Sequence, residues 1–125
     1  MMGNDIRVLE DRDKLFVDIL QTLGVRRQEA TLIAWMSGAG VVSSKDIEQG
    51  AGLRQSDVSK ILKSMQETGW VATLGTNNST KGRPRKIYSL STSLEDIVRY
   101  YELKKLKESI LAKESIQKLK DLALA

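Results

Sequence analysis

The chain has 125 residues, 41% of them hydrophobic and 29% charged, a length that fits one domain with a short appendage. It contains neither cysteine nor histidine, which excludes disulfides, thiol nucleophiles, imidazole bases and zinc sites of the usual kind. We therefore expect a protein that is not an enzyme, with no catalytic residues, no metal site and no cofactor. The net charge of +4 favours an anionic partner. Because this excess of positive charge is small, the positions of the charged residues are needed to decide whether such a partner binds.

Membrane and export signals are the next features to consider. No apolar run approaches the roughly 20 residues that cross a bilayer. The charged N-terminus lacks the apolar core of a signal peptide. The sequence therefore predicts a cytoplasmic protein without a membrane partner.

The first predicted helix begins at Asp11, after an arm (residues 1–10) that we expect to be flexible. Apolar residues recur at helical spacing, and Gly24 stands where a C-terminal cap would lie. These apolar residues are Leu15, Phe16, Ile19, Leu20 and Leu23.

A second helix is predicted from Arg26 to about Ser37, and only a stub of strand follows at Val41 and Val42. The helix is expected to bury Ala30, Leu32, Ile33, Ala34, Trp35 and Met36.

Two closely spaced helices follow. Ser43 and Asp46 form the pattern of a capping box, which starts a short helix that should end by Gly50. After a turn at Gly52 and Leu53, the next helix runs from Arg54 to Thr68 with an apolar stripe, and Gly69 ends it. The stripe consists of Val58, Ile61, Leu62 and Met65. Two helices joined by a short glycine-containing turn indicate a helix-turn-helix, although an ordinary helical hairpin shares this pattern.

Two β-prone runs complete the domain. Residues 70–74 and 86–90 flank a polar, turn-forming segment that holds the single proline, Pro84. A hairpin directly after a helix-turn-helix describes a winged helix. We therefore predict a mainly α fold with a small β-hairpin (α+β): a winged helix-turn-helix over residues 11–91, with a long C-terminal helix.

The C-terminal helix (residues 92–125) begins with a second capping-box pattern, Thr92 to Glu95, and nothing breaks it before about Ala123. Its length exceeds what a small domain needs, and its apolar residues are spaced as in a coiled coil. The predicted dimerisation residues are Leu94, Ile97, Tyr101, Leu103, Leu106, Ile110, Ile116 and Leu119. Self-association is favoured over packing of a single helix on its own domain.

Two sets of residues are candidates for DNA binding. The outward face of the helix from Arg54 carries types that bond base edges or phosphates, namely Arg54, Gln55, Ser56, Ser59, Lys60 and Lys63. A solvated polar face explains this helix equally well. The hairpin tip carries Lys81, Arg83, Arg85 and Lys86 with no carboxylate between them. Pro84 stiffens this tip, and a slender cationic ribbon suits the narrow minor groove.

The sequence resembles the winged-helix domain of the TrmB family of archaeal transcription regulators. The resemblance covers roughly residues 15–100 and rests on three segments in order: L-G-V-R-R-Q-E-A, then the run from S-S-K-D-I to T-G-W-V, then K-G-R-P-R-K-I-Y-S-L. Each segment also occurs in MarR- and ArsR-like regulators, so their order is the specific feature. The resemblance implies sequence-specific DNA binding, with the residues above at recognition-helix positions and Arg83 and Arg85 in the wing.

Two departures from the family pattern matter. Larger members carry a C-terminal sugar-binding domain, where this chain has a helix, so sensing by such a domain is not expected. Arg26, Arg27 and Gln28 replace acidic or aromatic residues of the family, which adds charge that could meet the DNA backbone.

The sequence therefore predicts a dimeric, nucleoid-associated regulator of transcription that binds double-stranded DNA, with its recognition helix in the major groove and its wing in the minor groove. The alternative is a winged-helix scaffold module inside a larger complex. The sequence leaves open the operator, the direction of regulation and the existence of a small-molecule effector.

Overall fold

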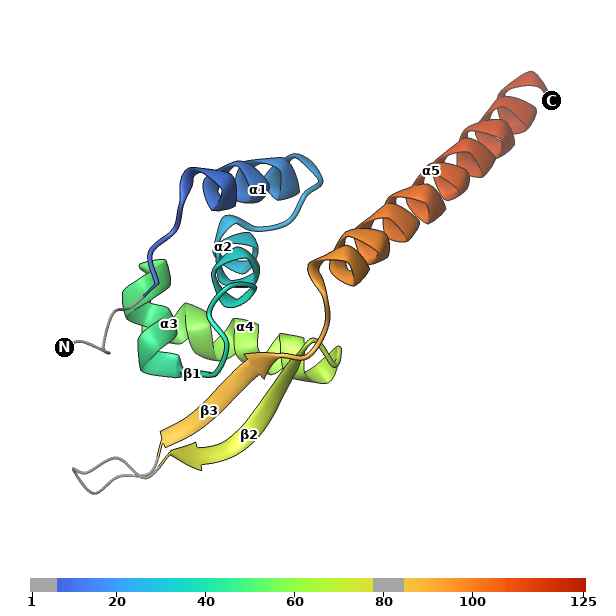
Figure 1. Cartoon of the computed structure of the whole chain (residues 1–125). Coiled ribbons are helices and arrows are strands. Elements are labelled where there is room, and N and C mark those ends of the chain that lie inside the picture. The colour runs from blue at the N-terminus through green and yellow to red at the C-terminus, as the bar shows by residue number, and fades with distance from the viewer. Residues whose placement is uncertain (1–6, 78–84) are drawn as a thin grey trace. The chain divides into compact units, whose positions relative to one another are not determined.

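The computed structural model describes residues 7–77 and 85–125 (Figure 1). It divides into two compact units, Met1–Ser93 and Leu94–Ala125. The elements of the first unit are α1 (Asp11–Thr22), α2 (Arg27–Met36), β1 (Val42–Ser43), α3 (Ser44–Ala51), α4 (Gln55–Glu67), β2 (Val71–Asn77) and β3 (Arg85–Leu90). The second unit is the 31-residue helix α5 (Leu94–Leu124). The predicted mainly α fold with a small β-hairpin is confirmed.

The sheet is antiparallel, with the strand order β1-β3-β2. The predicted hairpin forms between β2 and β3, from Val71 opposite Leu90 to Asn77 opposite Arg85. An irregularity in the pairing lies between Thr73 and Gly75, where Gly75 has a positive φ of 113°. The stub predicted near Val42 is also a strand, and it pairs with β3 on the other side.

Helix α2 forms the centre of the core. Every residue from Ala30 to Met36 is buried, as predicted for its apolar members, and Thr31 is buried with them. Trp35 is only 1% exposed, and its Nε1–H donates a hydrogen bond to the Arg7 carbonyl over 2.6 Å. A Cβ at Gly50 of α3 would lie 2.4–2.5 Å from the Trp35 ring. The tryptophan therefore packs directly against the backbone of α3.

Helix α1 buries Val17 and Leu20, while Leu15 and Ile19 are 60% and 53% exposed. Of the apolar residues that predicted this helix, Leu20 is therefore buried and Phe16 is partly buried. The apolar side chains of α1 lie on more than one face. Packing against α2 selects the face that carries Val17 and Leu20.

The last residues of the predicted flexible arm are held against the domain. Arg7 forms an ion pair with Asp13, with its Nη2 at 2.9 Å and 3.0 Å from the two carboxylate oxygens. Burial raises the pKa of the Asp13 carboxyl. Hydrogen bonds from Arg7 and from the Glu10 N–H, together with the charges of Arg7 and Arg12, lower this pKa by more than burial raises it. The pKa of Asp13 therefore lies below its usual value. Residues 1–6 lie outside the described part of the chain.

The helix-turn-helix is built from α3 and α4. The capping box is confirmed: the Asp46 N–H donates to Ser43 Oγ, and the Ser43 N–H donates to Asp46 Oδ2. The predicted end of α3 at Gly50 was wrong, because the helix continues to Ala51. Gly52 then adopts the left-handed conformation with a φ of 69° and forms the turn into α4.

Helix α5 has the length that the sequence predicted. At about 1.5 Å per residue it extends for roughly 46 Å. It begins at Leu94, two residues after Thr92, the first residue of the predicted capping box.

Replacing Gly50 by alanine tests the contact between α2 and α3. At a solvent-exposed position inside a helix, this change would stabilise the protein by up to about 1 kcal/mol, because alanine has a higher helix propensity than glycine. Here the new methyl group meets the buried Trp35 ring, so we expect a net destabilisation of about 1–3 kcal/mol. Urea denaturation measures it, with Gln49→Ala, at an exposed position of the same helix, as the control. A Gly50→Ala variant as stable as the native chain would show that α3 does not need this close approach.

Replacing Asp13 by asparagine tests the Arg7 ion pair. Because folding lowers the pKa of Asp13, its stabilising effect is complete above the unfolded pKa and is lost as the pH falls through the folded pKa. We expect Asp13→Asn to be less stable than the native chain at neutral pH, and the difference to shrink below about pH 4. Denaturation across this range checks it against the exposed control Asp18→Asn. A difference that stays constant into acid would mean that the charge of Asp13 is not what stabilises the arm.

Candidate nucleic-acid interface

Helix α4 has one buried face and one exposed face. Val58, Leu62 and Met65 are at most 4% exposed, which fixes the rotation of the helix about its axis. Ile61, the fourth residue of the predicted stripe, is half-buried. All six residues predicted to contact DNA from this helix lie on its exposed side: Arg54, Gln55, Ser56, Ser59, Lys60 and Lys63. We call this set the reading face.

The side chains of the reading face are free for a partner. Within the described part of the chain, none of them forms a hydrogen bond or an ion pair. Arg54 occupies the N-cap position with extended backbone and no side-chain capping bond, and Gln55 and Ser56 start the first turn. The N–H groups of a first turn have no partner within the helix, so this end favours anions as well as hydrogen-bond acceptors.

The turn before α4 sets where this N-terminus points. Gly52 ends α3 in the left-handed conformation, and the Leu53 N–H donates to the Glu48 carbonyl over 3.1 Å. The chain therefore leaves α3 abruptly and enters α4 at Gln55, three residues after Gly52. Figure 1 shows the two helices following each other across this turn.

The hairpin is attached firmly to the far end of α4. The Trp70 N–H donates to the Met65 carbonyl over 2.8 Å, and the Gln66 side chain donates to Thr73 Oγ1. On the returning strand, Ser91 donates through its N–H to the Trp70 carbonyl and through its hydroxyl to the Gly69 carbonyl. These bonds fix the base of the hairpin relative to the reading face.

The predicted wing residues are only partly described. Lys81 and Arg83 lie outside the described residues. Arg85 is the first residue of β3, opposite Asn77, and Lys86 follows opposite Thr76 with an exposed side chain. The contact of this wing with DNA stays a prediction.

The start of α2 brings a further arginine to the reading face. A recess of about 330 Å³ is lined by Arg27, Arg54 and Asp57, together with Leu53 and Thr31. The sequence placed Arg26, Arg27 and Gln28 at the start of the second helix, as added charge that could meet the DNA backbone, but it did not indicate a neighbour for them on α4. The proximity of Arg27 to Arg54 depends on the packing between α2 and the helix-turn-helix, which has no local sequence signal.

The predicted dimerisation residues on α5 differ in exposure. Ile97 and Tyr101 are buried in the single chain, and Leu94 is partly buried. The other five are 49–65% exposed, namely Leu103, Leu106, Ile110, Ile116 and Leu119. Only these five are available to a second copy of the chain.

Residues 7–77 and 85–125 contain no group of three or more His, Cys, Asp or Glu side chains placed to hold a metal ion. In the same residues, no helix has both the length and the apolar character needed to span a membrane.

Comparisons with known proteins give structural matches only. No protein-family model and no curated protein matches the sequence. A possible transcriptional regulator from Methanosarcina mazei aligns with a TM-score of 0.55 and 16% identity, over 83% of this chain and 85% of that one. The archaeal chromatin protein TrmBL2 aligns with a TM-score of 0.57 and 15% identity, over 85% of this chain but only 40% of that one. The multiple antibiotic resistance repressor MarR aligns with a TM-score of 0.50 and 18% identity, over 91% and 87%.

Identities this low establish the fold and not the activity. The fold they establish agrees with the elements above: a helix-turn-helix of α3 and α4, followed by a hairpin that is bonded to the end of α4. The chain therefore has the winged-helix fold that it shares with these transcriptional regulators.

Proposed function

We propose that the chain is a transcription regulator that binds double-stranded DNA sequence-specifically as a homodimer. The observation that carries the proposal is the reading face. Its arginine, glutamine, serine and lysine side chains are exposed, have no hydrogen bond or ion pair with any described residue, and are held outward by the buried stripe of α4. The structural neighbours support it, because they include a possible transcriptional regulator and a chromatin protein with a novel mode of DNA binding.

The residues have distinct roles in this proposal. Arg54 and Gln55, at the N-terminus of α4, read base edges in the major groove, since arginine bonds guanine and glutamine bonds adenine in a bidentate manner. Lys60 and Lys63 contact phosphates and set the register on the duplex. Arg27 reaches the backbone beside Arg54, with which it shares a recess.

The wing has a separate role. Lys81, Arg83, Arg85 and Lys86 contact the adjacent minor groove and its phosphates, because negative potential there attracts cationic side chains. This part of the proposal rests on the sequence of the tip.

Selection of bound sequences from a random pool of duplexes tests the proposal. We expect one enriched motif, and a loss of about 1–3 kcal/mol on that motif for Gln55→Ala or Arg54→Ala, with relaxed preference at one base pair. Lys63→Ala should weaken binding to all sequences alike, and Gln21→Ala, at an exposed position of α1, is the matched control. A pool that enriches no motif would contradict the proposal and favour a scaffold module.

We expect the homodimer to form through the exposed apolar residues of α5. Leu103, Leu106 and Ile110 follow each other at spacings of three and four residues, as in a coiled coil, and each is about half exposed. A twofold dimer would present two reading faces to successive major grooves, about 34 Å apart or a multiple of that distance.

Substitution of two of these residues in the full chain tests the dimer. The double substitution Leu106→Gln with Ile110→Gln should shift the mass measured by light scattering from that of a dimer to that of a monomer. The reason is that two apolar side chains of the expected helix–helix interface are replaced by polar ones. Lys104→Gln with Glu108→Gln, on the opposite side of α5, should leave the dimer intact. If the apolar pair has no effect on mass, the chain is a monomer or its interface lies elsewhere.

A further inference from the structure

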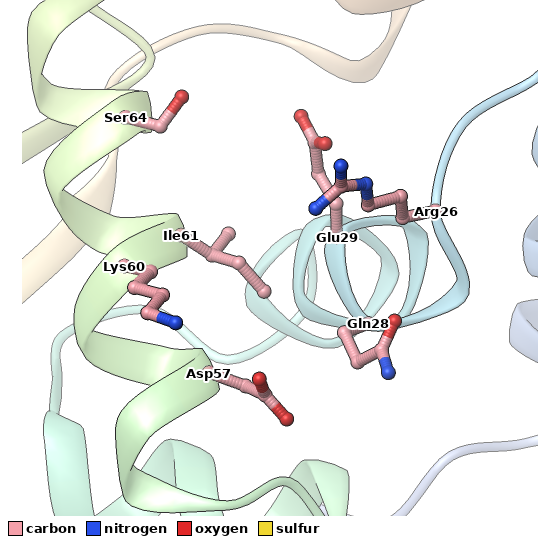
Figure 2. A pocket seen from close by; sticks show the side chains of 7 residues that line it. All are labelled: Arg26, Gln28, Glu29, Asp57, Lys60, Ile61 and Ser64. Carbon is pink, nitrogen blue, oxygen red and sulfur yellow. The ribbon is translucent and has the colours of Figure 1, made fainter.

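Charged side chains without an ion pair or hydrogen bond to any described residue occur both in a recess of the first unit and along α5. The recess has a volume of about 290 Å³ and lies between α2 and α4, and Figure 2 shows the carboxylates of Glu29 and Asp57 at its opposite ends. Charges that lie apart in this way do not define a ligand. The free charges of α5, in contrast, lie beside exposed apolar residues in a regular order.

The exposed apolar residues of α5 cover three successive layers of a coiled coil. Leu103 and Ile110 are seven residues apart and Leu106 lies between them, so they take the a and d positions of a heptad abcdefg. They are 49–55% exposed. We call these three residues the dimer stripe. Lys113 and Gln117 occupy the next d and a positions, so the stripe ends after Ile110.

Free charges of opposite sign flank the dimer stripe. In the same heptad frame Glu102 takes a g position and Lys107 an e position, and both positions border the seam between two paired helices. Both side chains are exposed, and neither has an ion pair or a hydrogen bond with a described residue. Lys105 and Glu108, at c and f positions away from the seam, are instead paired with each other over 3.5 Å.

Lys107 has no carboxylate within reach along its own helix. Ion pairs on a helix surface join residues that are three or four positions apart. Around Lys107 these positions hold Leu103, Lys104, Ile110 and Leu111. A carboxylate for Lys107 therefore has to be supplied from outside this helix.

The flanking charges distinguish the two directions in which two copies of α5 could pair. In a parallel pair the g position of one helix faces the e position of the other, so Glu102 faces Lys107 of the partner subunit. An antiparallel pair brings g beside g and e beside e. Along the dimer stripe, Glu102 would then face a second Glu102 or Ser109, and Lys107 would face a second Lys107 or Tyr100. Only the parallel direction brings opposite charges together.

We propose that two copies of α5 pair in parallel and in register along the dimer stripe, with Glu102 of each copy forming an ion pair with Lys107 of the partner subunit. This inference rests on the homodimer of the proposed function and specifies how its two copies meet. The twofold symmetry makes the ion pair occur twice. Because the first unit ends at Ser93, directly before Leu94, a parallel pair attaches both first units at the same end of the two helices.

Reversal of single charges in the full chain tests the ion pairs. Glu102→Lys places lysines opposite each other in a parallel dimer, and Lys107→Glu places glutamates opposite each other. Each should raise the dissociation constant of the dimer about threefold to tenfold, measured by light scattering over a dilution series. The effect should shrink in about 1 M salt, where the Debye length is about 3 Å. Glu108→Lys and Lys104→Glu, which make the same charge changes on the opposite side of α5, should leave the dissociation constant unchanged.

A mixture of the two variants tests whether these residues face each other. A parallel heterodimer of Glu102→Lys with Lys107→Glu has opposite charges at both points of contact, so it should form in preference to either homodimer. Native mass spectrometry, with a tag on one variant, should find a larger share of heterodimer than random pairing gives.

Single cysteines report the direction of pairing. The chain has no cysteine of its own, so an introduced one is unique. The d position at Lys113 brings its two copies to disulfide distance in a parallel pair, about 4.4–6.8 Å between Cα atoms. In an antiparallel pair centred on the dimer stripe they are more than about 15 Å apart. Oxidation of Lys113→Cys should therefore give a covalent dimer on a nonreducing gel, and the control Glu108→Cys should not.

The outcomes separate this inference from the proposed homodimer. A chain that is dimeric by light scattering, but in which Lys113→Cys cross-links no faster than Glu108→Cys, would overturn the parallel direction. Random pairing in the mixture of charge variants would overturn the ion pairs. Either result leaves the homodimer standing if Leu106→Gln with Ile110→Gln still lowers the mass. A native chain that is monomeric throughout the dilution series would overturn the homodimer and this inference together, and would leave the stripe to a different protein.

Discussion

The contact between Trp35 and Gly50 is the constraint on which the rest of the winged helix depends. It brings α2 and α3 to a separation that leaves no room for a side chain at position 50. Because α3 continues through the left-handed Gly52 directly into α4, the placement of α3 carries over to the N-terminus of α4. The hydrogen bond from Trp70 to Met65 then carries it from the end of α4 to the hairpin. The position of the reading face on α4 therefore depends on the packing of the Trp35 ring against the backbone of α3 at Gly50.

The same contact explains which elements were predictable from the sequence. The stripe of α4, the buried run of α2 and the capping box at Ser43 are local patterns that a few neighbouring residues specify. The end of α3 was not predictable, since a glycine in a helix is unfavourable unless something requires it. The ring of Trp35, fifteen positions away in the sequence, supplies that requirement.

The other differences also come from contacts between distant residues. Both Val17 and Ile19 are apolar, and only packing against α2 decides that Val17 is buried and Ile19 exposed. Arg7 looks like part of a charged arm, yet its ion pair with Asp13 and its carbonyl bond to Trp35 fix it on the domain. The candidate site was predictable to the same extent: the residues of α4 follow from its periodicity, whereas the recess that Arg27 shares with Arg54 requires the placement of α2.

Charge is distributed unevenly over α4, and this distribution says more than the net charge of +4. Arg54, Lys60 and Lys63 point outward, while Asp57 is half-buried toward the start of α2. At physiological salt the Debye length is about 8 Å, so a phosphate interacts mainly with the charges it touches. The charges on the exposed face of α4 therefore matter more for a phosphate at that face than the net charge of the whole chain does.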